Sequence, residues 1–377
     1  MSMKSRLSTI TAIALLSLPL VAQDLAQKSE NRSVFRIVPT VSSNPTAGTG
    51  AGVTATALYY VDEDSSPSQA IVSGTYTDSK SYNIVAINKM FFKSDKWQSN
   101  TFAAHIYNNM AYTIPNALMP VLPPMTEEDN EVRYNASIYT AMQQFLYEAV
   151  PNFYAGAQLF YISQQFDALN DAGESFLQTR GIENSTRGGY GISLIYDTRS
   201  KSEKIYPKDA ALINVTANHF PKAFGSEESY YNLMLNAREY TPGFKPNDVV
   251  AMQFYAQYSS PDTPDGALAA LGGRNILRGF PIGLHKARNM LAAQGEYRYR
   301  IEGTRFRATA FAGYAHLSGG SAGTETGSRD TDNGSYYSGG VGVHYILAPK
   351  QQLDYRVNVA YTNEGELFVY ASLNQAF

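Results

Sequence analysis

Side chains with the chemistry for catalysis or metal binding are few in this chain. The sequence contains no cysteine, which excludes disulfide scaffolds, cysteine-based zinc sites and thiol catalysis. No histidine stands in the H-E-x-x-H spacing of a zinc hydrolase. We therefore expect no catalytic residue, no cofactor and no metal site, and we predict that the protein is not an enzyme. The five histidines are spread along the chain at His105, His219, His285, His316 and His344.

The composition favours a membrane barrel over a cytosolic protein. Among 377 residues, 30 Lys+Arg balance 33 Asp+Glu, so the net charge of -3 gives no reason to expect nucleic acid as a partner. Charged residues make up 17% of the chain, below the ~25% of an average soluble domain. The chain also has 28 Tyr against one Trp, together with 29 Gly. Few charges with many tyrosines and glycines are typical of an outer-membrane β-barrel.

The first residues are predicted to be an export signal. Lys4 and Arg6 give a basic start, and the apolar stretch that follows is shorter than the ~20 residues a membrane-spanning helix needs. We assign a signal peptide to residues 1–22 and a short N-terminal extension to residues 23–32. The remaining chain, 33–377, is then the folded domain.

Apolar and polar residues alternate along many segments of this domain. Residues 189–197 and 353–361 are clear examples, and a period of two is the pattern of a β-strand. Repeated apolar rows opposite polar rows suit a membrane barrel, because one face meets lipid and the other meets the lumen. Sixteen strands are predicted, at 34–42, 49–61, 68–78, 82–92, 97–109, 132–149, 153–166, 188–197, 208–219, 229–240, 248–258, 289–300, 304–316, 335–346, 351–361 and 365–377.

The lengths of the connections indicate how these strands are arranged. The long connections, 110–131, 167–187, 259–288 and 317–334, are all odd-numbered, whereas the even-numbered ones are mostly brief. Long outer loops and short periplasmic turns are the rule for bacterial barrels. We therefore predict an all-β protein, a 16-stranded antiparallel transmembrane β-barrel in the bacterial outer membrane.

The chain ends on an apolar strand that closes with an aromatic residue. Leu373 and Phe377 share one parity, and Phe377 is the last residue. This ending resembles the signal by which bacterial outer-membrane barrels are recognised for insertion. It implies that the barrel assembly machinery is a partner in the protein's own insertion.

The most specific motif lies in residues 271–300, which read LGGRNILRGFPIGLHKARNMLAAQGEYRYR. It resembles the [VIL]-R-G-[FY] motif in the bacterial surface antigen domain of the BamA/TamA outer-membrane assembly superfamily. In that family the motif occupies a long sixth outer loop that folds back into the barrel, and here it lies in the sixth predicted outer loop. The motif residues are Leu277, Arg278, Gly279 and Phe280, with Gly272 and Gly273 before them.

A second resemblance lies at a predicted inner turn. The D-T-R turn of the same family resembles a stretch of this chain, namely Asp197, Thr198 and Arg199, which are followed by Tyr206 and Pro207. Members that assemble or secrete proteins carry periplasmic POTRA modules before the barrel, and the few residues after the predicted signal leave no room for one. The chain therefore resembles a barrel-only branch, and a separate periplasmic partner would replace the missing modules.

The resemblance implies that Arg278 lies inside the barrel. An always-charged guanidinium there needs carboxylate partners. Glu296 has the strand parity of Arg298, which directs it into the lumen, so it is the first candidate partner. Asp354 is the second candidate. The family has an Asp on the following strand where this chain has Gly313, so Gly313→Asp is expected to strengthen the pairing.

The resemblance implies a function in inserting or translocating proteins or lipids at the outer membrane, with outer-membrane lipids as partners. Arg278 would either only pin the loop or also take part in gating or assembly. A passive channel or porin is the alternative, and a structural or adhesive surface protein is a third reading. In a porin, the arginines predicted to face the lumen would favour the passage of anions. These are Arg238, Arg298, Arg300, Arg305 and Arg307.

Overall fold

The computed structural model describes most of the predicted barrel domain. The predicted signal peptide, Gly273 and Phe377 lie outside the described residues. No helix in the described part of the chain has the length and apolar character needed to cross a membrane. The described ranges are 33–44, 48–113, 131–179, 182–272, 276–280, 285–319, 333–349, 353–365 and 367–373.

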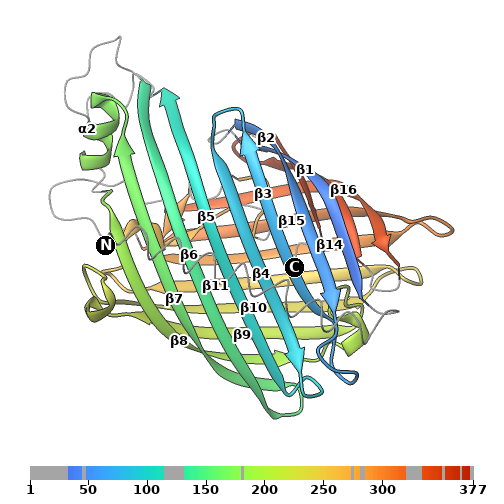
Figure 1. Ribbon diagram of the computed structural model, residues 1–377. Coiled ribbons are helices and arrows are strands. Elements are labelled where there is room, and N and C mark those ends of the chain that lie inside the picture. The colour runs from blue at the N-terminus through green and yellow to red at the C-terminus, as the bar shows by residue number, and fades with distance from the viewer. Residues whose placement is uncertain are drawn as a thin grey trace.

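Sixteen long strands form one antiparallel sheet that closes into a barrel (Figure 1), which confirms the predicted fold class. The predicted strands 82–92 and 289–300 coincide with β4 and β14, whereas β5 ends at Thr113 rather than at residue 109. The barrel strands are β1 (Val34–Asn44), β2 (Gly48–Tyr59), β3 (Ser68–Thr77), β4 (Tyr82–Phe92), β5 (Trp97–Thr113), β6 (Glu131–Val150), β7 (Phe153–Ala168), β8 (Ser185–Asp197), β9 (Ala210–Phe220), β10 (Tyr230–Pro242), β11 (Val249–Ser259), β14 (Asn289–Arg300), β15 (Phe306–Ser318), β16 (Gly334–Ala348), β17 (Leu353–Thr362) and β18 (Leu367–Leu373).

Each strand turns apolar side chains outward and polar side chains inward. Ile192 is 61% exposed and Val341 is 62% exposed, on the outside of the sheet, where lipid would cover them. Arg298 and Asn358, by contrast, are buried inside. This arrangement inverts that of a soluble protein, because the hydrocarbon of the membrane takes the place of an apolar core.

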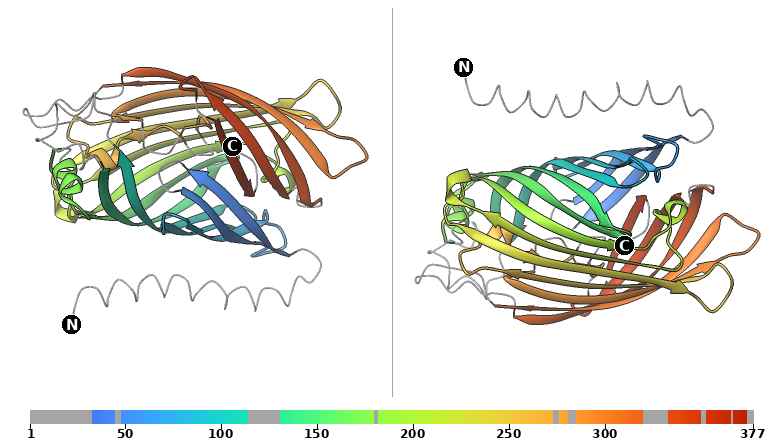
Figure 2. Two further views of the ribbon diagram at one scale, coloured as in Figure 1. Left: turned by 90° about the horizontal axis from the view of Figure 1, so that it is seen from above. Right: turned by 90° about the horizontal axis from the view of Figure 1, so that it is seen from below.

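The two ends of the barrel differ in their connections. The outer end carries the long connections, including the one with helix α2 (Asp171–Thr179), which packs through Ala172 and Leu177 on Val132 of β6. The inner end carries the shorter connections. Figure 2 shows the barrel from two opposite sides, with the strands running across each view. In the described part of the chain, single turns of 3-10 helix lie at η3 (Lys201–Glu203), η4 (Lys222–Phe224) and η5 (Asp265–Ala267).

The barrel closes through a short seam between β1 and β18. Within the described residues, Ser42 and Tyr370 are the one pair of Cα partners across this seam. The neighbouring interfaces are much longer: β17 and β18 share seven residue pairs, and β1 and β2 share eleven. Within the described residues, this seam is therefore joined by fewer residue pairs than either neighbouring interface.

The sixth outer connection lies between β11 and β14, and its described segment 276–280 folds into the lumen as predicted. It contains a short hairpin, β12 (Ala269–Ala270) and β13 (Lys286–Ala287), that the sequence analysis did not identify. Leu277 and Phe280, between these two strands, belong to an apolar cluster with lumen-facing residues of the barrel wall. The cluster comprises Tyr255, Ala269, Leu271, Leu277, Phe280, Ala287, Met290, Ala292, Ala315, Leu317 and Tyr336.

Candidate functional site

The motif segment 276–280 packs against the lumen face of β14 to β17. Leu277 and Phe280 are each only 1% exposed. Gly279 has a φ of +116°, and a Cβ built on it would lie 2.7 Å from the Cγ2 atom of Thr362. Because the backbone here is left-handed and the wall is close, glycine is the residue that fits. The segment is thus held tightly rather than resting loosely in the lumen.

A buried ion triad anchors this segment to the barrel wall. Nη1 of Arg278 lies 2.6 Å from Oε2 of Glu296, and Nε of Arg298 lies 2.7 Å from Oε1 of the same carboxylate. All three side chains are fully buried. The guanidinium of Arg278 also lies over the ring of Phe311, with Cζ 3.5 Å from the ring centroid, which is a cation–π contact. The structure therefore brings Arg278 together with its first candidate partner and adds Arg298.

The second candidate partner, Asp354, belongs to another interior cluster. Its carboxylate accepts a hydrogen bond from Arg307 and lies 3.8 Å from Nδ1 of His344. Arg307 and Asp354 are on β15 and β17, and both are buried. One expected lumen residue is misplaced: Arg305 lies in the β14–β15 connection and is exposed, because β15 begins one residue later, at Phe306.

The space beside Gly313 is already filled, which contradicts the expectation for Gly313→Asp. A Cβ built on Gly313 would lie 2.8 Å from the Cβ of Gln294 and 2.9 Å from the Cδ1 of Leu277. Leu277 is part of the motif itself and comes from the folded-in loop. The loop side chain thus occupies the position that an acidic side chain would need, so restoring the acid would displace the loop rather than strengthen its anchor.

We predict that Gly313→Ala and Gly313→Asp each lower the free energy of unfolding by about 1–3 kcal/mol, the usual cost of overpacking. Unfolding by guanidinium chloride, followed by heat-modifiable migration on a gel, measures this change. The matched control is Gly295→Ala, where the nearest atom to the added Cβ, the carbonyl oxygen of Ala251, is 4.0 Å away. A Gly313→Asp barrel more stable than both the wild type and Gly313→Ala would restore the original expectation.

The turn motif is a network of ionic and hydrogen bonds at the inner end. Arg199 donates to Asp197 through Nε at 2.8 Å and through Nη2 at 2.9 Å, a bidentate geometry. Nζ of Lys204 lies 2.8 Å from the same carboxylate. The hydroxyl of Thr198 accepts a hydrogen bond from the backbone N–H of Ala211 at 2.8 Å. These contacts fix the course of the β8–β9 connection.

The fixed connection places Tyr206 inside the barrel, close to the charged clusters. The ring of Tyr206 is 1% exposed, and its centroid lies 3.9 Å from Cζ of Arg307 and 5.6 Å from Cζ of Arg298. Burial raises the pKa of the Tyr206 hydroxyl above its ordinary value, so the group stays protonated. A continuous series of contacts therefore runs from the inner-end turn through Tyr206 and Arg298 to Glu296 and the Arg278 loop.

Other residues of the predicted sites are placed only in part. Gly272, with a φ of +106°, forms a β-bridge with Ile276 at the start of the motif segment. The backbone of Leu373 is the end of β18. The role of Leu373 and Phe377 as an insertion signal stays a prediction.

Two participants in the site were not recognised in the sequence as contacts of the motif. In the sequence analysis, Arg298 only indicated that Glu296 points into the lumen. Residues two apart on a strand share a face, so Arg298 could also have been expected to pair with Glu296. Tyr206 was noted only for its family resemblance. Its entry into the lumen depends on the folding of a connection, for which strand periodicity gives no signal.

Comparison with known proteins places the chain among outer-membrane barrels. The Omp85 superfamily domain matches residues 68–363, which is most of the chain. This match agrees with the family resemblance of the Leu277–Phe280 motif. No curated protein matches the sequence.

Three solved structures are similar in fold. BamA from Haemophilus ducreyi lacking POTRA domains 1-3 has a TM-score of 0.52 at 13% identity, covering 91% of this chain and 70% of that one. CdiB from Acinetobacter baumannii has a TM-score of 0.61 at 10% identity, covering 91% of this chain and 59% of that one. CdiB from Escherichia coli has a TM-score of 0.61 at 12% identity, covering 90% of this chain and 61% of that one. The chain thus spans about three fifths of the length of either CdiB.

Proposed function

Because this chain belongs to the Omp85 superfamily, we propose that it inserts or translocates proteins or lipids at the bacterial outer membrane. The observation that carries the proposal is the seam between β1 and β18, with its one Cα pair, Ser42 and Tyr370, among the described residues. A strand edge with few pairing partners is a template for adding another strand. The seam is therefore the place where the barrel would open toward the membrane or pair with an incoming strand.

The alternative of a passive channel has less support. Sixteen-stranded barrels leave room for an aqueous path. In this barrel the segment 276–280 packs on the lumen wall, and the Arg278–Glu296 ion pair anchors it. In the proposed function the anchored segment keeps the lumen closed while the seam serves as the working surface. A separate periplasmic protein that delivers the substrate is part of the same proposal.

The expectation that the chain is not an enzyme also belongs to this proposal. The G-x-S-x-G spacing of a hydrolase nucleophile is present at Gly319, Gly320, Ser321, Ala322 and Gly323. In hydrolases this spacing lies at a turn from a strand to a helix. Here it follows β15 in the sequence, and residues 320–323 lie outside the described residues.

A disulfide across the seam tests the proposed function. Ser42→Cys with Tyr370→Cys places two cysteines at positions of direct Cα partners, in a chain that has no other cysteine. We predict that a strain whose only copy is the disulfide-locked protein has the same phenotype as a strain from which the gene is deleted. A reductant that opens the disulfide should restore function. The measurement is quantitative comparison of outer-membrane proteins and lipids in the deletion, wild-type and locked strains.

The matched control is a disulfide where no opening is expected. Val38 and Thr54 are Cα partners between β1 and β2. Val38→Cys with Thr54→Cys should leave the outer membrane as in the wild type. If the seam-locked protein also leaves the outer membrane unchanged under oxidising conditions, while the deletion alters it, opening of the seam is not the mechanism.

A further inference from the structure

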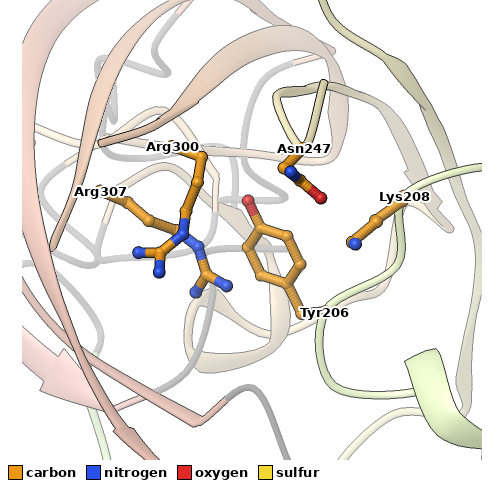
Figure 3. Close-up of a pocket in the computed structure, with 5 residues that line it drawn as sticks. All are labelled: Tyr206, Lys208, Asn247, Arg300 and Arg307. Carbon is orange, nitrogen blue, oxygen red and sulfur yellow. The ribbon is translucent and has the colours of Figure 1, made fainter. Parts of the chain in front are cut away.

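A small pocket of about 190 Å³ lies at the inner end of the barrel (Figure 3). It is below the ~300 Å³ at which pockets for drug-sized ligands begin, so its size suits a small ion or a single headgroup. Segments far apart in the sequence build it. The lining residues are Tyr206 and Lys208 from the β8–β9 connection, Asn247 from the β10–β11 connection, Arg300 from β14 and Arg307 from β15.

The pocket is strongly cationic. Three of its five lining residues carry a positive charge, and none carries a negative charge. Asp354 offsets the charge of Arg307. Among the described residues, no carboxylate forms an ion pair with the ammonium of Lys208 or the guanidinium of Arg300, although the backbone N–H of Arg300 donates to Oδ1 of Asp248 at 2.9 Å. About two positive charges therefore remain to face the pocket.

The two arginines of the pocket are held in place before any ligand arrives. The guanidinium of Arg300 donates through Nη1 to the carbonyl oxygen of Phe306 at 3.1 Å and through Nη2 to that of Thr304 at 2.6 Å. Arg307 stacks on the ring of Tyr206 at 3.9 Å. Fixed donors lose little conformational entropy on binding, which favours affinity.

The hydroxyl of Tyr206 is a second sign of a missing ligand. Tyr206 is 1% exposed, and within the described part of the chain its hydroxyl has no hydrogen-bond partner. Figure 3 shows this hydroxyl directed into the space between Arg300 and Asn247. A buried donor without an acceptor is unfavourable, and an oxyanion in the pocket would satisfy it.

We propose that this pocket binds a phosphate-class anion at the periplasmic mouth of the barrel. Phosphate oxygens accept charge-assisted hydrogen bonds from guanidinium and ammonium groups, and the phenol of Tyr206 and the amide of Asn247 complete a set of donors. The source of the phosphate is either the free inorganic ion or the headgroup of an anionic phospholipid. The proposal rests on the pocket alone and is independent of the proposed transport function.

Calorimetric titration of the full-length barrel in an uncharged detergent tests the proposal, with sodium phosphate against sodium chloride at equal ionic strength. We expect wild-type protein to bind phosphate, and both Lys208→Ala and Tyr206→Phe to bind it about tenfold more weakly, the effect of losing one charge-assisted or buried hydrogen bond. Lys245→Ala is the matched control, because Lys245 is an exposed cation of the same β10–β11 connection that does not line the pocket. Heat-modifiable migration verifies that each variant is folded, and Lys208→Gln replaces Lys208→Ala if the latter is not.

The outcomes separate the site from general charge attraction and identify the source. No phosphate binding by the wild type, equal binding by all variants, or an equal loss in Lys245→Ala would overturn the proposal. Native mass spectrometry of protein extracted from phosphatidylcholine vesicles containing phosphatidylglycerol then compares lipid retention. Retention of phosphatidylglycerol by wild type and Lys245→Ala, but not by Lys208→Ala, identifies a lipid headgroup as the ligand. Phosphate binding without such retention identifies the free ion.

Discussion

Replacing Glu296 with alanine is expected to lower the free energy of unfolding of the barrel by about 3–5 kcal/mol, the cost of leaving buried charges without their partner. Glu296 accepts from Arg278 at 2.6 Å and from Arg298 at 2.7 Å, and all three side chains are fully buried. Without the carboxylate, two guanidinium groups would lose the anion that lies between them. A guanidinium group stays protonated in proteins, so neither arginine can become neutral to lower this cost.

Replacing Arg278 is expected to cost less than replacing Glu296, because the carboxylate then keeps Arg298 as a partner. The double variant Arg278→Ala with Glu296→Ala should be less destabilised than the sum of the single variants, since groups in direct contact are not additive. Guanidinium chloride unfolding of the refolded protein in lipid vesicles, followed by heat-modifiable migration, measures all three values.

Glu228→Ala is the matched control for Glu296→Ala. Glu228 pairs with Lys222 at 2.8 Å, but the two side chains are 61% and 56% exposed, so this substitution should cost less than about 1 kcal/mol. Additive effects of Arg278→Ala and Glu296→Ala, or a larger effect for Arg278→Ala, would mean that the shared carboxylate does not anchor the loop.

The strands and the first ion pair were predictable because both depend on a period of two. Alternation in 353–361 shows which residues of β17 face lipid, and Val357 and Val359 are indeed exposed on the outer surface. The same parity directs Glu296 inward, and a buried arginine in the loop then needs that carboxylate. These inferences need only the alternation of residues within one strand, together with the family resemblance, which implies that the motif loop folds into the barrel.

The rest of the site depends on packing between distant segments, which periodicity does not describe. The side chain of Leu277, from the loop, fills the space beside Gly313, so the structure now leads us to expect that Gly313→Asp destabilises the barrel. Tyr206 reaches Arg298 and Arg307 only because the turn at Asp197 holds its connection in the barrel mouth. The cationic pocket likewise combines residues from three separate parts of the sequence.

Removing the folded-in segment is expected to raise the single-channel conductance of the barrel several-fold. Intact protein in planar bilayers should give small, flickering currents, because the segment 276–280 packs on the lumen face of β14 to β17. A 16-stranded barrel without this segment has room for an aqueous path, so steady and larger currents should follow.

The fold offers a clean way to make this change. The backbone N–H of Leu271 donates to the carbonyl oxygen of His285 at 2.9 Å, so the two residues are already hairpin neighbours. Replacing residues 272–284 by Asn-Gly would join them through a two-residue turn and leave β12 and β13 in place. Replacing residues 114–130 of the β5–β6 connection by a short linker is the control, and it should leave the currents small. Large, steady currents from the intact protein, unchanged by the Asn-Gly replacement, would favour a passive channel and show that the loop anchored by Arg278 does not close the lumen.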